Sequence, residues 1–159
     1  MNMKRIGLLA TGIGVLISVG LLTVEQGYTE EKEHATTCSL TTVKGRYLFV
    51  VNGTYFPPAA GVKVESLFTR AGYRIFNGDG TGTTIVTNSI NGVITGADAH
   101  LDLSYTVNAD CTGTFKVQVA PGVQATSEMF IAPNGDDMTI IATDNGHVEA
   151  YSSWRVEPE

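Results

Sequence analysis

Asp98, His100 and Asp102 are three residues whose types and spacing suggest chemistry. They alternate with apolar residues in a run that predicts a strand, so all three lie on one face. Such a face offers carboxylates and an imidazole for metal binding or acid–base work. Side chains at positions i and i+2 of a strand stand roughly 7 Å apart, which is too far for three tight ligands unless the strand bends strongly. A solvated outer face is the simpler interpretation, and no metal is expected.

A second polar group lies on one face of the last predicted strand, and consists of His147, Glu149, Tyr151 and Arg155. A group of His, Glu and Tyr can move protons in a cofactor-free isomerisation or cyclisation. An ordinary polar surface is the simpler interpretation, because the alternate residues are apolar and suit an inward face. These apolar residues are Val148, Ala150, Trp154 and Val156.

Two oxygen-rich loops, 77–80 (NGDG) and 134–137 (NGDD), resemble calcium-binding loops in composition. Hairpin turns explain both, although two adjacent carboxylates keep weak calcium binding as an alternative at 134–137. The stretch 52–54 matches a glycosylation acceptor, but it overlaps a strand end and indicates a turn. The serines have no nucleophile-elbow context, so we assign no catalytic residue and expect no cofactor.

Cys38 and Cys111 are the only cysteines of the chain. Both follow an apparent export segment, and disulfides persist in oxidising compartments. We therefore predict that they pair, with a reactive or metal-binding thiol as the alternative. In the chain-entropy model, closing so long a loop stabilises the fold by roughly 4 kcal/mol.

The export segment is residues 1–24, where Lys4 and Arg5 precede an uncharged apolar run from 6 to 24. This pattern predicts a signal peptide or an N-terminal membrane anchor. Either one places the rest of the chain outside the cytoplasm, as a secreted, periplasmic or membrane-tethered protein. Residues 25–37 form a predicted acidic flexible spacer, and 38–159 form the predicted domain. The formal net charge of −6 disfavours nucleic acid as a partner.

From Thr42 onward, short β-branched and aromatic runs are interrupted by Gly, Asn, Asp or Pro, which is typical of an all-β domain. The predicted strands are 45–52, 62–69, 73–76, 81–88, 98–107, 114–120, 124–131, 138–143 and 148–156. Short connections favour antiparallel neighbours, so we predict a single closed antiparallel up-and-down β-barrel of about eight strands. A β-sandwich is the alternative, and it would need longer crossover connections.

Apolar residues on the predicted inward faces are candidates for lining a ligand pocket. They are Tyr73, Leu101, Leu103, Tyr105, Phe115, Met129 and Trp154. An eight-stranded barrel is either filled by side chains or just wide enough to hold one small ligand. Both states stay open at this stage.

Three stretches carry a resemblance to a known group: 38–53 (CSLTTVKGRYLFVVNG), 76–82 (FNGDGTG) and 105–114 (YTVNADCTGT). They resemble small exported bacterial barrels related to allene oxide cyclases and, more loosely, to lipocalins and other calycin-like barrels. The resemblance implies the barrel fold, a disulfide and a homo-oligomer. Its motifs are strand and turn motifs, so it carries over no active-site residue.

Three functions remain open on these observations. The first is an exported barrel that binds a small apolar or aromatic molecule in its interior. The second is a cofactor-free isomerase or cyclase of the allene oxide cyclase type, and the third is a purely structural or surface-interaction barrel. The interior discriminates between them: an empty apolar cavity favours binding, an inward carboxylate or histidine favours catalysis, and a filled core favours a structural role.

Overall fold

The computed structural model describes residues 37–57 and 62–157. The predicted export segment 1–24, and all but the last residue of the predicted spacer 25–37, lie outside these ranges. Within them, no helix is long and apolar enough to cross a bilayer.

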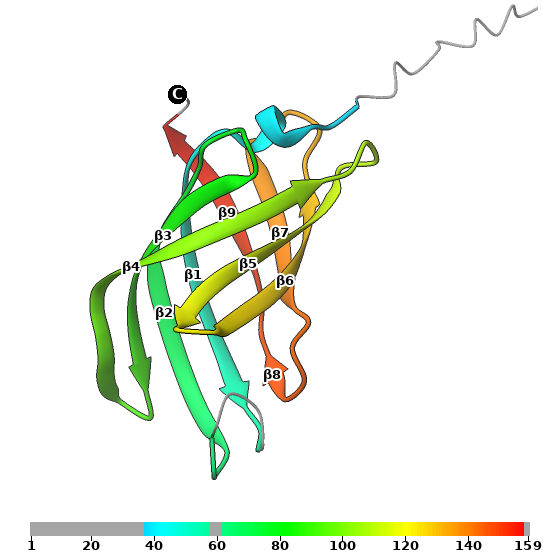
Figure 1. Ribbon diagram of the computed structural model, residues 1–159. Coiled ribbons are helices and arrows are strands. Elements are labelled where there is room, and N and C mark those ends of the chain that lie inside the picture. The colour runs from blue at the N-terminus through cyan, green and yellow to red at the C-terminus, as the bar shows by residue number, and fades with distance from the viewer. Residues whose placement is uncertain (1–36, 58–61, 158–159) are drawn as a thin grey trace, which may run out of the picture. The chain divides into compact units, whose positions relative to one another are not determined.

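Eight antiparallel strands form a closed barrel (Figure 1). Around the ring they are β1 (Gly45–Tyr55), β2 (Ser66–Phe76), β3 (Thr81–Ile90), β4 (Val93–Val107), β5 (Thr112–Ala120), β6 (Val123–Ile131), β7 (Asp137–Ala142) and β9 (Ala150–Glu157). The sheet closes because β1 pairs with β9 on one side and with β2 over its full length on the other. The two-residue β8 (His147–Val148) lies outside the ring and pairs with the end of β1. The predicted barrel is confirmed, and this closure excludes the sandwich.

β2 is one continuous strand where the sequence analysis predicts two, 62–69 and 73–76. The apparent break contains Gly72, which lies opposite Val86 of β3 in an unbroken ladder. A Cβ atom at this position would lie 1.9 Å from the backbone oxygen of Ile85. The glycine therefore permits close approach of β3 and does not end the strand.

The two ends of the barrel differ. At the closed end, β1 begins and a short 3-10 helix, η1 (Leu40–Val43), packs its fully buried Val43 into the core. The disulfide between Cys38 and Cys111 joins the segment before η1 to the β4–β5 turn, as predicted. The opposite, open end is where β1 ends. The β5–β6 turn at 121–122 and the β7–β8 loop at 143–146 also lie at this end.

β4 and β5 pair only next to the closed end, where Leu103–Val107 of β4 pairs with Gly113–Val117 of β5. Toward the open end, the β3–β4 hairpin diverges from β5 (Figure 1). A bulge in β4 accompanies this divergence, since the register to β3 shifts near Asn88 and Asp98 has a φ of 50°. The wall of the barrel is therefore incomplete between β4 and β5 at the open end.

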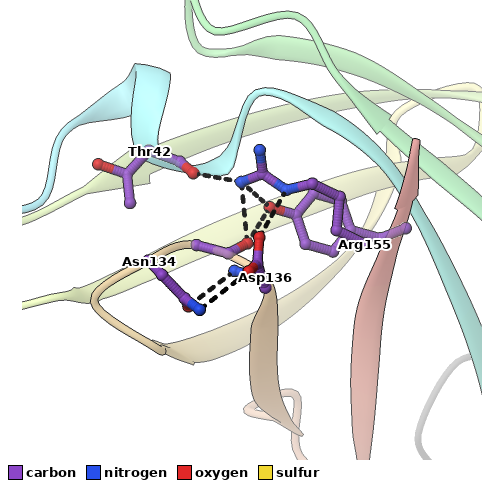
Figure 2. Close-up of polar contacts among 6 residues, drawn as sticks. Thr42, Asn134, Asp136 and Arg155 are labelled. Carbon is purple, nitrogen blue, oxygen red and sulfur yellow. Dashed lines mark hydrogen bonds and ion pairs between the residues drawn. The ribbon is translucent and has the colours of Figure 1, made fainter. Parts of the chain in front are cut away.

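Arg155 of β9 fastens the closed end. One of its nitrogens, Nη2, donates to the backbone oxygens of Thr42 (2.6 Å) and Gly135 (2.9 Å) and to the Tyr47 hydroxyl (2.8 Å). Its Nε lies 3.6 Å from a carboxylate oxygen of Asp136. Figure 2 shows the guanidinium between the end of η1 and the β6–β7 loop. One side chain thus ties together η1, β1, β9 and this loop.

The predicted faces of the last strand are wrong. His147, Glu149, Tyr151, Ser153 and Arg155 point inward, and the alternate apolar residues point outward. Those outward residues are Val148, Ala150, Trp154 and Val156. The prediction assumed an apolar interior, whereas this part of the interior is polar.

Candidate functional site

Polar side chains from adjacent strands meet inside the barrel at the open end. β1 contributes Tyr55, and its neighbour β2 contributes Arg70 and Arg74. On the other side of β1, the segment through β8 and β9 contributes His147 and Glu149. In all three segments the side chains alternate between the two faces, so residues at even spacing share the interior.

Arg70 lies at the centre of this group. Its Nη2 donates a hydrogen bond to the Tyr55 hydroxyl, and lies 3.3 Å from Nε2 of His147 and 3.8 Å from Oε2 of Glu149. Its guanidinium also lies 4.2 Å from the ring centroid of Phe68. These contacts fix the arginine against one wall of the interior.

His147 stands between two competing partners. Its Nε2 is 3.3 Å from Glu149 Oε2 and 3.3 Å from Arg70 Nη2. Because a guanidinium donates and never accepts, the contact with Arg70 requires Nε2 without a proton, whereas a bond to Glu149 requires Nε2 with one. The proton on this imidazole therefore selects which neighbour the ring bonds.

The ionisation of the group follows from its neighbours. Burial raises the pKa of Glu149, but the hydrogen bond from His147 and the charge of Arg70 outweigh burial and leave the pKa below its ordinary value. Burial raises the pKa of the Tyr55 and Tyr151 hydroxyls despite nearby arginines. At neutral pH the site thus holds an ionised carboxylate and two protonated phenols.

Arg74 lies deeper than Arg70 and is 5% exposed. Its guanidinium carbon lies 4.2, 4.5 and 5.2 Å from the ring centroids of Phe49, Phe115 and Tyr151. Within the described ranges, its buried Nε and Nη1 have no hydrogen-bond partner. Aromatic rings attract the cation but do not replace conventional acceptors for its N–H groups.

A pocket of about 280 Å³ opens at this end of the barrel. Val119, Val123 and Ala125 form an apolar wall, while Tyr55, Arg70 and His147 form a polar one. A smaller cavity of about 40 Å³ lies beside Arg74, Thr84, Phe115, Ser127 and Glu149. The two spaces share Arg70, Val119 and Ala125, so the arginine stands between the mouth and the deeper cavity.

The predicted pocket residues do not form one site. Leu101 and Phe115 line the deeper cavity. Leu103, Tyr105 and Met129 are packed in the core and line neither space. The expected inward orientation of Tyr73 and Trp154 is wrong, because each is 39% exposed on the outer face, beside Leu48.

The sequence analysis missed Tyr55, Arg70 and Arg74, and placed His147 and Glu149 on the wrong face. A signal for the arginines exists in the sequence: Phe68, Arg70, Arg74 and Phe76 are separated by even numbers of residues. They therefore share one face if 66–76 is a single strand. The expected break at Gly72 concealed this spacing.

The other polar groups lie away from the interior. Asp98, His100 and Asp102 are exposed on the outer face of β4, as expected. In the loop 77–80, Asp79 accepts hydrogen bonds from the backbone and side chain of Thr81, and these bonds stabilise a turn. In the loop 134–137, Asp136 contacts Arg155 (Figure 2). No cluster of three or more metal-ligating side chains occurs among residues 37–57 and 62–157.

The chain matches no protein-family model, and no curated protein or solved structure matches it. Functional inference therefore rests on the chemistry of the site.

Proposed function

We propose that the protein binds a small, mainly apolar or aromatic molecule at the open end of the barrel. The pocket of about 280 Å³ carries this proposal, because it combines an apolar wall with a few converging polar groups. That combination is characteristic of small-molecule sites, which are concave and mostly apolar with a small number of orienting polar side chains. The interior of the closed half is packed by fully buried side chains such as Met129 and Ile140, and the hollows beside it lie on the outer surface, where polar residues such as Lys116 and Glu128 line them.

A tryptophan reporter tests the proposal. In a Trp154→Phe background, Val119→Trp places one indole at the mouth, where a bound molecule changes its emission. A panel of aliphatic and aromatic compounds should include members that shift this emission and raise the melting temperature. The unsubstituted protein is the control, since its Trp154 lies on the outer face and should not respond. A panel without any response in emission or melting temperature contradicts the proposal.

A cofactor-free isomerisation or cyclisation is the second candidate, and the position of His147 between Arg70 and Glu149 favours it. An imidazole whose Nε2 has a partner both with its proton, Glu149, and without it, Arg70, is suited to proton transfer. Glu149 is a weak base, because its pKa is below its ordinary value.

Hydrogen exchange in a substrate tests this candidate. Carbonyl compounds with acidic C–H bonds, incubated with the protein in heavy water, should gain deuterium faster than without protein. His147→Gln should abolish the gain if the imidazole is the base. Exchange that is no faster with the protein than without it would leave binding as the only supported function, and equal acceleration by the original protein and the variant would exclude His147 as the base.

We also infer that the chain is one of the small exported barrels resembling allene oxide cyclases and lipocalins. A closed eight-stranded antiparallel barrel and a disulfide support this inference. Export as a secreted, periplasmic or tethered protein, and assembly as a homo-oligomer, stay predictions. Mass spectrometry of the N-terminus from fractionated cells and sedimentation of the purified protein are their tests.

A further inference from the structure

The charges inside the open end do not balance. Two arginines, Arg70 and Arg74, face one carboxylate, that of Glu149. Arg70 lies 3.8 Å from Glu149, whereas Arg74 forms no ion pair within 4.0 Å among the described residues. At the rim lies a second carboxylate, Asp144, whose Oδ2 accepts a hydrogen bond from the Thr126 backbone at 2.8 Å. The deep part of the site therefore holds excess positive charge, and its rim holds negative charge.

Arg74 has N–H groups that lack hydrogen-bond acceptors among residues 37–57 and 62–157. The residue is only 5% exposed, and neither Nε nor Nη1 has a hydrogen-bond acceptor within the described part of the chain. Leaving buried donors of a charged group unsatisfied is costly, and native structures rarely do so without a reason. The cavity of about 40 Å³ beside this guanidinium is where an acceptor fits.

We propose that the natural ligand is an amphipathic monocarboxylate whose carboxylate pairs with Arg74 in the deeper cavity and whose apolar part fills the mouth. This proposal rests on the proposed binding function and names the class of molecule bound. A carboxylate matches the planar, multi-donor guanidinium, as a phosphate also does, but it supplies the single negative charge that the interior lacks, whereas a phosphate monoester carries more than one.

The site also fixes the orientation of the ligand. The carboxylate of Asp144 at the rim repels an anionic head group there and leaves the deeper position as the favourable one. The deeper cavity is only about 40 Å³, which suits a carboxylate and excludes a bulky head group. Val119, Val123 and Ala125 at the mouth then cover the apolar part.

A pair of ligands with the same chain tests the class directly. Octanoate and octanol differ in the head group, so calorimetric titration of the purified protein compares charge at constant apolar area. We expect octanoate to bind at least about tenfold more tightly than octanol, as a charge-assisted contact requires. Acetate tests the head group alone and should bind far more weakly than octanoate.

Two arginine variants with the same change in charge locate the effect. Arg74→Met should weaken octanoate binding by roughly 10- to 100-fold and leave octanol binding unchanged. Arg46→Met is the matched control, because Arg46 lies on the outer face with its guanidinium 5.4 Å from the Tyr73 ring centroid. Arg46→Met should bind octanoate and octanol with the same affinities as the original protein.

The outcomes separate the two proposals. If neither octanoate nor octanol binds and the compound panel is also silent, the binding function itself is wrong. If octanol binds as tightly as octanoate, or if Arg46→Met and Arg74→Met weaken octanoate equally, binding stands and the carboxylate class is wrong. The comparison of the two ligands on the unsubstituted protein decides the class even where Arg74→Met fails to fold.

Discussion

Glu149 is an ionised carboxylate inside the barrel, with a side chain only 4% exposed. Its burial is tolerated because His147 and Arg70 supply compensating contacts. These contacts favour the ionised form, and they leave the pKa of the folded protein below the ordinary value. By linkage, the resulting stability is present above the unfolded pKa of about 4.3 and is lost as pH falls through the lower folded pKa.

Glu149→Gln tests this linkage. The variant lacks the ionised form at every pH, so its melting temperature should lie below that of the original protein at neutral pH. The gap should narrow as the pH falls from about 4.3, where the unfolded chain takes up the proton, through the lower pKa of the folded protein. Thermal melts from pH 7 to pH 3 measure it, and the other carboxylates cancel because both proteins contain them. A gap that is constant over this range contradicts the role of ionised Glu149.

Substitutions of Met129 and Leu101 compare a side chain in the packed core with one in the wall of the cavity. Met129 is fully buried in the closed half, whereas Leu101 lines the deeper cavity. We expect Met129→Ala to cost about 2–5 kcal/mol of unfolding free energy, because it leaves a new void. Leu101→Ala should cost less, since its removed atoms border existing space. Urea unfolding of both variants measures the difference, and equal costs would mean that the cavity is filled in solution.

At the residue scale, the alternation of apolar residues predicted the inward positions of Leu103, Tyr105 and Phe115. It failed for His147 and Glu149, because apolar patterning assumes a dry core and cannot detect a polar interior whose partners come from another strand. Those partners, Arg70 and Arg74, lie about 75 residues earlier in the chain. Only the pairing of β1 with β2 on one side, and with β8 and β9 on the other, brings them together.

At the scale of elements, β6, β7 and η1 are held together at one glycine. Gly135, in the β6–β7 loop, has a φ of 73°, and its carbonyl accepts hydrogen bonds from Arg155 and Tyr47. A Cβ atom there would lie 2.0 Å from the Thr42 backbone oxygen and 2.6 Å from Arg155 Nη2. The contact between the loop and η1 therefore needs both a positive φ and the absence of a side chain.

Gly135→Ala and Gly122→Ala form a matched pair. Gly122, in the β5–β6 turn, has a φ of 75°, but a Cβ atom there meets no atom within 4 Å. Gly122→Ala should therefore cost only the backbone strain of about 1–2 kcal/mol. Gly135→Ala should cost clearly more, because the clash also displaces η1 and Arg155. Chemical denaturation measures both, and similar costs would show that η1 is not held by this loop.

The elements were predictable where local chemistry decides them. The turn residues at 91–92 mark the end of β3, and those at 121–122 mark the end of β5 and the start of β6, because Asn-Gly and Pro-Gly pairs supply turn conformations. The predicted start of the next strand at 98 was wrong, since β4 begins at Val93. β2 was divided wrongly, because a glycine inside a strand and a glycine in a turn look alike in sequence. The pairing of β4 with β5 is short and is accompanied by a bulge near Asp98, and no sequence pattern marks either feature.

At the scale of the whole barrel, structure and binding are separated along the axis. The closed end contains η1, the disulfide and the Arg155 contacts, and its core is tightly packed. The open end contains the buried charges and both cavities. Buried charges and space cost stability, so the packing and cross-link at the closed end offset what the open end loses.

Removing the disulfide tests this division. Cys38 and Cys111 are 73 residues apart in sequence, and in the chain-entropy model such a cross-link contributes about 4 kcal/mol through the unfolded state. The double variant Cys38→Ser with Cys111→Ser should therefore melt on the order of 10 °C lower. The cysteines lie at the closed end, whereas Arg70 and His147 lie at the open end. The folded variant should therefore bind any compound that the original protein binds with unchanged affinity. Calorimetry at a temperature where both proteins are folded measures this affinity. A parallel loss of affinity and stability would show that the closed end shapes the pocket as well as stabilising the barrel.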